Sequence, residues 1–173
     1  ESARATLARL CGQFSFAVDC AAVDSRGRML TVEPPAFRIH EGKDISSQGH
    51  IKQISATRKP VMSSVFKAVE GFHAVDVEYP VSAPDGSYLG SVSLLFKPEK
   101  FLGDIVKPLV KGTPVDIWVM EKEGRILYDG KAGEIGLNLF KAKLYRPYTD
   151  LIRLGKRISV KPEGSGGYWF LDG

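Results

Sequence analysis

The chain has 173 residues, a formal net charge of +4 and a hydrophobic content of 43%. This apolar fraction is typical of a folded globular protein and excludes a disordered chain. The longest apolar runs are far shorter than the roughly 20 residues that a membrane-spanning helix needs. The composition therefore predicts a folded piece outside the bilayer, with room for one large domain or two small ones.

Charge is uneven in one part of the chain. Residues 36–67 contain six Lys and Arg residues against two acidic ones. Such a segment is compatible with an anionic small ligand, a nucleic acid or an ordinary solvated surface. A nucleic-acid interface needs a denser basic stripe with exposed aromatic side chains between the charges. No nucleic-acid partner is therefore expected.

The first hundred residues mix helical and strand periodicities. Alternation is clearest in FHAVDVEYPV, which places Asp76 and Glu78 on the same face of a strand. Gly-containing turns separate the apolar runs and predict antiparallel hairpins. The expected elements, in chain order, are a helix over 2–13, a hairpin over 16–33, a helix over 48–57, and strands over 61–69, 72–81 and 88–96.

The second half repeats part of this pattern. A linking helix is expected over 99–110, where Pro98 at the first turn loses no helical hydrogen bond. Residues 115–129 then repeat the strand–turn–strand unit of 16–33. A short helix over 148–157 and a strand over 168–172 are expected to follow. Two related modules in series are typical of a sensor rather than an enzyme.

The two cysteines, Cys11 and Cys20, are too few for a disulfide scaffold. We interpret them as buried free thiols, with a single bridge as the alternative if the domain faces an oxidising space. No CxxC or Cys/His cluster has the spacing of a zinc site. No metal and no cofactor are therefore expected.

Three stretches carry a resemblance to extracellular Cache sensors, the PAS-like ligand-binding domains of histidine kinases and chemoreceptors. TRKPVMSSV (57–65) resembles the entry to the family's third strand, and YPVSAPDGSYLGSVS (79–93) is similar to its Pro- and Gly-containing hairpin. IWVMEKEGRILYDGKAGEIGLNLF (117–140) resembles the opening of the membrane-proximal module. In this order and spacing they resemble the tandem form, called double Cache.

The resemblance implies an α+β fold of two PAS-like (Cache) modules with antiparallel sheets and an N-terminal helix. The membrane-distal module would cover 1–105, with the helix at 1–13. The membrane-proximal module would cover 106–173 and be small or incomplete. The resemblance also implies an extracytoplasmic location, anchoring in the cell membrane through flanking segments outside this chain, and a homodimer.

The ligand of such a module would lie between its sheet and the covering helix. Six residues are candidates for that site: Arg58, His50, His73, Asp76, Ser93 and Phe66. The Arg58 guanidinium matches a carboxylate, so a small, anionic metabolite is expected. Many amino-acid-binding double Cache domains carry an Arg and a Trp two residues apart, and ISATRKPVMSS (54–64) lacks that Trp. An α-amino acid is therefore not expected.

No catalytic set emerges from the sequence. It contains no Walker loop, HExxH or GxSxG motif, and its carboxylates are spread singly. The predicted function is a small-molecule sensor domain of a histidine kinase or chemoreceptor, and not an enzyme. The alternative is a PAS-like protein–protein interaction domain without a ligand.

Overall fold

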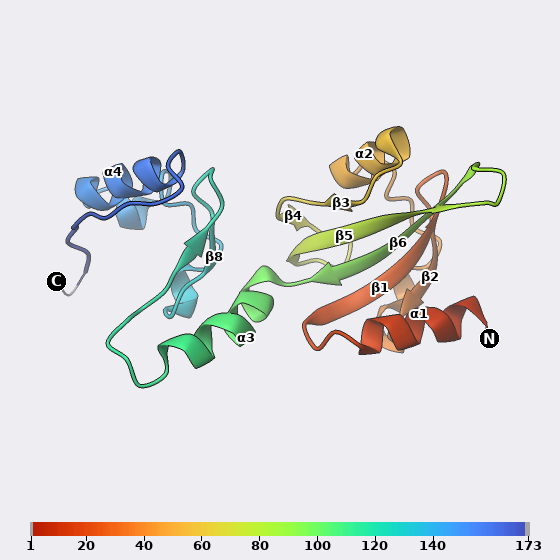
Figure 1. The fold of residues 1–173 in the computed structure, drawn as a ribbon, viewed down its shortest axis with the longest axis horizontal. Coiled ribbons are helices and arrows are strands. Elements are labelled where there is room, and N and C mark those ends of the chain that lie inside the picture. Colours follow the sequence, from red (N-terminus) through yellow and green to blue (C-terminus); the bar gives the residue numbers. More distant parts are fainter. Residues whose placement is uncertain (1, 172–173) are drawn as a thin grey trace. The chain divides into compact units, whose positions relative to one another are not determined.

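The computed structural model describes residues 2–171 and divides into two compact units. One unit extends to Lys100 and the other begins at Phe101. α3 (Pro98–Val110) begins in the first unit and continues into the second. Each unit has its own sheet and its own apolar core (Figure 1).

The first unit is built on a six-stranded antiparallel sheet. The strands follow the order β2-β1-β6-β5-β3, and β4 pairs separately with β5. The predicted hairpin and the following meander are both present. The strands are β1 (Ala17–Asp24), β2 (Met29–Glu33), β3 (Val61–Met62), β4 (Phe66–Lys67), β5 (His73–Ser82) and β6 (Tyr88–Phe96).

Two helices cover opposite faces of this sheet (Figure 1). α1 (Ala3–Gly12) is capped by the Ser2 hydroxyl, which accepts a hydrogen bond from the backbone N–H of Ala5. α1 packs Leu7 and Cys11 against one face. α2 (Gly49–Thr57) packs Ile51 against the other face, after the short helical turn η1 (Pro35–His40). We call these the α1 face and the α2 face.

Cys11 and Cys20 form a disulfide that ties α1 to β1, with their Cα atoms 5.7 Å apart. The interpretation as free thiols is therefore wrong, and the alternative of a single bridge holds. Alternation along β1 directs Cys20 toward α1, where both sulfur-bearing side chains are buried. A disulfide is expected in an oxidising compartment and not in the cytoplasm.

Gly90 allows β6 to lie directly beside β1. A Cβ at this position would overlap the carbonyl oxygen of Val23, and the Gly90 φ of +142° is one that other residues rarely adopt. Gly90 pairs with Asp24 at one end of the β1–β6 ladder, which runs from there to the pair Ala17 and Phe96. Alternation along β6 from this point places Ser93 and Leu95 on the same face as Asp76 and Glu78.

The strand predicted over 61–69 is broken into β3 and β4. At the break, the Ser63 hydroxyl accepts a hydrogen bond from the backbone N–H of Asp76 at 2.9 Å. Because this N–H is taken by a side chain, regular backbone pairing with β5 stops after Met62. The interruption lies beside the polar part of β5.

The second unit has less regular structure. Its two-stranded sheet pairs β7 (Val119–Met120) with β8 (Ile126–Tyr128), which are shorter than the predicted hairpin. The turns η2 (Ala132–Glu134) and η3 (Lys143–Tyr145) and the helix α4 (Thr149–Ile158) complete it. The prediction of a strand over 168–172 is wrong for 168–171, and its last residue lies outside the described part.

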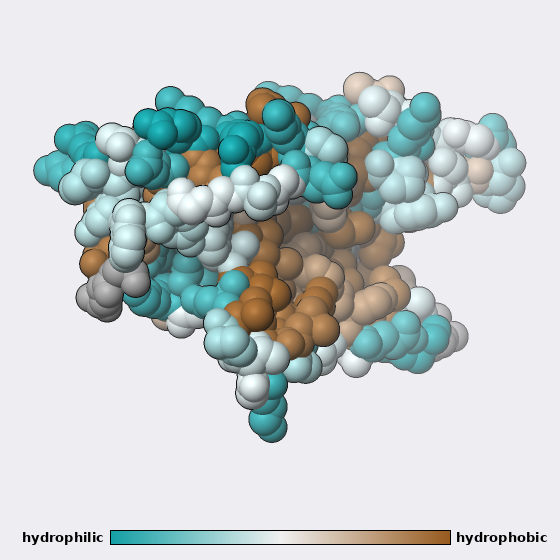
Figure 2. Space-filling model, turned by 60° about the vertical axis from the view of Figure 1, so that its left-hand side comes forward, coloured by the Kyte–Doolittle hydropathy of each residue, from teal (hydrophilic) through white to brown (hydrophobic). Residues whose placement is uncertain are grey.

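Apolar side chains are not confined to the interior. In the view of Figure 2, apolar residues are visible at the surface, and Ile105 and Leu109 of α3 are among the large hydrophobic residues that are exposed. Within 2–171, no helix combines the length and the apolarity that crossing a membrane requires.

Candidate functional site

The α2 face of the first unit carries a group of buried polar side chains. Asp76 and Glu78 lie two residues apart on β5 and therefore point to the same face. The strand register adds neighbours: Leu95 of β6 pairs with Asp76 on one side and with Asp19 of β1 on the other. Ser93 of β6 pairs with Glu78. Antiparallel pairing thus brings acids from distant strands onto one surface.

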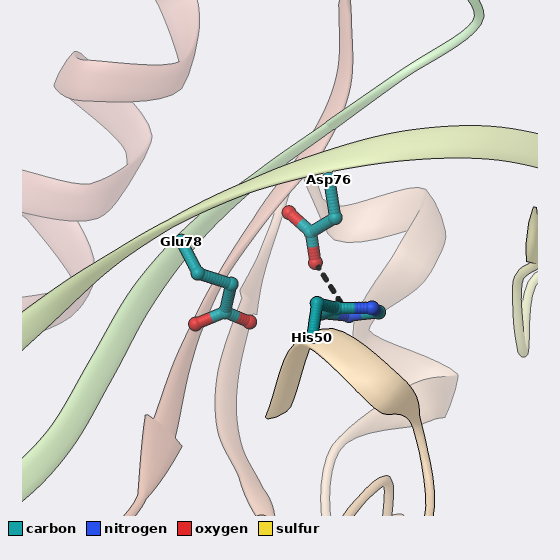
Figure 3. A group of neighbouring side chains, drawn as sticks. All are labelled: His50, Asp76 and Glu78. Carbon is teal, nitrogen blue, oxygen red and sulfur yellow. Dashed lines mark ion pairs between the residues drawn. The ribbon is translucent and has the colours of Figure 1, made fainter. Parts of the chain in front are cut away.

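α2 adds a histidine to this group. The buried His50 side chain extends from α2 toward β5, and Figure 3 shows it converging with Asp76 and Glu78. His50 Nε2 lies 3.4 Å from Asp76 Oδ2. The His50 ring also contacts the Phe66 ring, with centroids 4.6 Å apart. His50 is therefore fixed between an apolar wall and a carboxylate.

A small cavity adjoins these side chains. Its volume, counted as the space open to the centre of a water molecule, is about 20 Å³. Its polar lining includes three carboxylates, and no Lys or Arg is among the described residues around it. The lining residues are Asp19, Met29, Ile45, Gln48, Phe66, Val69, Glu70, Asp76, Ser93 and Leu95.

Burial makes ionisation of these acids unfavourable. Burial, reinforced by the charges of Glu70 and Asp76, raises the pKa of Asp19 to about 8. Burial and the adjacent Asp76 carboxylate raise the pKa of Glu78 to about 8. The α2 face therefore disfavours negative charge unless a cation is supplied.

Several polar atoms of the group have no hydrogen-bond partner among the described residues. Buried polar groups are normally hydrogen-bonded, so unpaired ones need an explanation. These atoms are Asp19 Oδ2, His50 Nε2, Asp76 Oδ1, both carboxylate oxygens of Glu78, and Ser91 Oγ. All belong to residues of the α2 face or to the helix that covers it. Their lone pairs are available to a bound species.

The structure brings together four of the six residues predicted from the sequence: His50, Phe66, Asp76 and Ser93. It does not bring Arg58 or His73 into the group. Arg58 ends α2 with a φ of 54°, and its exposed guanidinium lies 3.9 Å from the centre of the Tyr88 ring. His73 is exposed at the start of β5.

Two acids of the group were missed by the sequence prediction. Glu78 was visible from the alternation that placed it beside Asp76, but nothing in the sequence showed that this face is buried. Asp19 lies in AVDCAAVD, an apolar strand in which a central carboxylate is unusual. Both are almost completely buried in the structure.

The sequence also gave no indication of a cavity in the second unit. Its volume, counted in the same way, is about 90 Å³. The Tyr145 hydroxyl donates a 2.8 Å hydrogen bond to Glu134 at its edge. Other lining side chains include Asp116, Trp118 and Lys131. Unlike the first unit, this site mixes acids with a cation.

The fold and site define a mixed helix-and-sheet sensor domain of the PAS/Cache type. Residues 1–98 match the family model described as HK/GC/Chemotaxis protein-like, sensor domain. The chain belongs to this family of sensor domains of signalling proteins. The resemblance to Cache sensors is thereby confirmed. No curated protein matches the chain.

Solved structures support the same assignment. An extracellular ligand binding receptor from Desulfohalobium retbaense is 36% identical, with a TM-score of 0.82 over 96% of this chain and 28% of that chain. The ligand binding domain of the Pseudomonas aeruginosa amino acid chemoreceptor PctC is 20% identical, with a TM-score of 0.54 over 81% of this chain and 65% of that one. The sensor domain of the V. cholerae histidine kinase DctB is 10% identical, with a TM-score of 0.59 over 76% of this chain and 48% of that one. The chain thus spans about a quarter of the first relative and about half to two thirds of the others.

Proposed function

We propose that the chain is the extracytoplasmic sensor region of a transmembrane histidine kinase or chemoreceptor, and that its first unit binds a small ligand between the sheet and α2. The family assignment supports the receptor class. One observation supports the place of binding: the buried acids of the α2 face have lone pairs without partners. Such groups destabilise a fold unless they serve a bound species.

The ligand, in this proposal, carries positive charge. The sequence led us to expect an anion held by Arg58, but Arg58 lies outside the group and the cavity is lined by carboxylates. An anion among Asp19, Asp76 and Glu78 would be repelled, whereas a cation would stabilise their ionised forms. The PctC domain is described in complex with GABA, and a Campylobacter jejuni Tlp3 domain with 4-methylisoleucine. Both of those ligands carry an amino group as well as a carboxylate.

Signalling would follow from a difference in affinity. A ligand shifts an equilibrium only if it binds one arrangement of α2 and the sheet better than another. The shift would pass through α3, which continues from one unit into the next. The second unit, in this proposal, is the membrane-proximal Cache module, and the chain is anchored through flanking segments and works as a homodimer.

A thermal-shift screen tests the proposal. The compounds are small amines, amino acids and carboxylates, applied at pH 7 to the wild type, Asp76→Asn and Arg58→Ala. We expect an amine at a hundredfold excess over its Kd to raise the wild-type midpoint by about 5–10 °C. Asp76→Asn should lose most of this rise because it removes the charge that the ligand neutralises.

Arg58→Ala is the matched control, because it removes an exposed charge outside the cavity and should keep the rise. The proposed ligand charge would be overturned if only the carboxylate compounds stabilised the wild type, and if this stabilisation were lost in Arg58→Ala and kept in Asp76→Asn. No stabilisation by any compound would favour the alternative, a protein–protein interaction domain without a ligand.

A further inference from the structure

Three potential metal ligands converge on the α2 face (Figure 3). His50 comes from α2, and Asp76 and Glu78 come from β5. One donor atom from each lies within 4.8 Å of the others, and all three side chains are buried. No sequence motif foreshadows this trio, because His50 is far from the two acids along the chain.

The fold satisfies the donor atoms of this trio only in part. Both carboxylate oxygens of Glu78, Oδ1 of Asp76 and Nε2 of His50 lack hydrogen-bond partners within the described residues. The His50–Asp76 separation of 3.4 Å is an ion-pair distance without a hydrogen bond. Two carboxylates on one strand face, without an Arg or Lys between them, are costly to ionise unless a cation is supplied.

The dimensions of the site suit a metal ion. The adjoining cavity has only about 20 Å³ for water centres, which is room for about one water molecule or ion. A divalent ion bonded at about 2.0–2.2 Å would hold its donors roughly 3–4 Å apart. His50 and Asp76 already meet this spacing, and Glu78 needs only a small side-chain movement.

The chemistry of the donors points to a particular kind of ion. Ca²⁺ and Mg²⁺ prefer oxygen ligands, whereas an imidazole with two carboxylates suits Zn²⁺ and its first-row neighbours. Three protein ligands leave a coordination position for water or for part of a sensed molecule.

We propose that His50, Asp76 and Glu78 bind a divalent first-row transition-metal ion, with Zn²⁺ as the probe. This inference rests on the proposed function, because it assigns the cation that the sensor unit binds. The ion would link α2 to β5 directly. Metal occupancy would thereby bias the position of the helix that covers the sheet.

Calorimetric titration with ZnCl₂ tests the inference, with CaCl₂ and MgCl₂ as comparison ions. We expect the wild type to bind one Zn²⁺ per chain and to bind Ca²⁺ and Mg²⁺ at least tenfold more weakly. His50→Gln, Asp76→Asn and Glu78→Gln should each weaken Zn²⁺ binding at least tenfold. Circular dichroism of each variant without metal shows that the fold is retained.

Two control variants separate this site from others. His73→Gln removes an exposed imidazole outside the trio, and Asp104→Asn removes an exposed carboxylate of α3. Both should keep Zn²⁺ affinity within about threefold. The assignment would be overturned if His73→Gln lost as much Zn²⁺ affinity as the trio variants, or if Glu78→Gln kept the wild-type affinity.

The thermal-shift screen distinguishes this failure from a failure of the proposed function. If Zn²⁺ does not bind but an amine stabilises the wild type and not Asp76→Asn, the metal assignment is overturned and the sensor proposal stands. If neither Zn²⁺ nor any amine binds, both are overturned.

Discussion

Two buried glutamates of the first unit differ sharply in their surroundings. Glu33, at the end of β2, is 2% exposed, and its Oε1 contacts Arg4 Nη1 of α1 at 2.9 Å and Arg38 Nη2 of η1 at 2.6 Å. Glu78, on β5, is 0% exposed, its polar neighbours include the Ser91 hydroxyl and the Asp76 carboxylate, and no Arg or Lys of the described residues pairs with it. Hydrogen bonds from Arg4 and Arg38 lower the pKa of Glu33, whereas burial and Asp76 raise the pKa of Glu78 to about 8.

The difference separates structural from functional acids. The cations of Glu33 come from two segments that pack on β2, so the ion pairs help to hold α1 and η1 in place. Glu78 opposes folding at pH values where it ionises, because its charge is then buried without compensation. A chain that supplies two arginines to one buried acid and none to another leaves the second available for a ligand. Substitutions should therefore have opposite effects at the two places.

The largest expected effect is a change in the pH dependence of stability in Asp19→Asn. Asp19 has a pKa of about 8 in the folded protein and ionises near 3.9 in the unfolded chain. Between these values the folded state binds more protons, so the free energy of unfolding falls as pH rises, by up to about 1.4 kcal/mol per unit. From pH 5 to 8, wild type should lose as much as about 4 kcal/mol more than Asp19→Asn.

Urea unfolding of both proteins at pH 5, 6.5 and 8, without added metal, measures this difference. Asp104→Asn removes an exposed carboxylate of α3 and should follow the wild type. If the unfolding free energies of wild type and Asp19→Asn change with pH in the same way, Asp19 is not held protonated by the fold. The contrast between the acids of the α2 face and Glu33 would then be wrong for Asp19.

The next effect compares the glutamates directly. Glu78→Gln removes an uncompensated buried charge, so we expect the metal-free protein to gain about 1–3 kcal/mol of unfolding free energy at pH 8. Glu33→Gln removes the carboxylate of Arg38 and one of the two carboxylates of Arg4, which keeps Glu41, and should lower the unfolding midpoint. Chemical denaturation at pH 8 shows whether each variant is more or less stable than the wild type. Destabilisation in both variants would mean that Glu78 serves the fold.

The smallest effect concerns a buried acid with a single neutral partner. Glu134 of the second unit accepts a hydrogen bond from the Tyr145 hydroxyl. Tyr145→Phe keeps the ring in its core but removes that donor, which should cost about 1–2 kcal/mol. Differential scanning calorimetry measures the loss, with Tyr168→Phe on the rim of the same cavity as the control. An unchanged midpoint in Tyr145→Phe would place Glu134 with the acids that the fold does not need.

Much of the first unit could be predicted from its sequence. Alternation in FHAVDVEYPV and the turn at Pro84–Ser87 predicted β5 and β6 almost to the residue, because half-buried antiparallel strands leave a period of two. The break between β3 and β4 was missed, since it depends on a hydrogen bond from Asp76 to a serine hydroxyl. The second unit was less predictable, because its strands are short.

The candidate site could be predicted only in part. Asp76 and His50 were chosen for their chemistry, but whether they meet depends on how α2 crosses the sheet. Arg58 was favoured because its guanidinium suits a carboxylate, yet it ends α2 in a left-handed conformation and contacts Tyr88 instead. Side-chain direction at a helix end is set by the cap and not by the periodicity of the helix.

The account rests on the claim that the acids of the α2 face bind a ligand and do not serve the fold. Anomalous diffraction from crystals soaked in ZnCl₂, recorded at the zinc edge, tests it most directly. We predict a peak bonded to His50, Asp76 and Glu78 at about 2.0–2.2 Å. A site free of density, with Glu78 hydrogen-bonded to neighbouring protein groups, would contradict it.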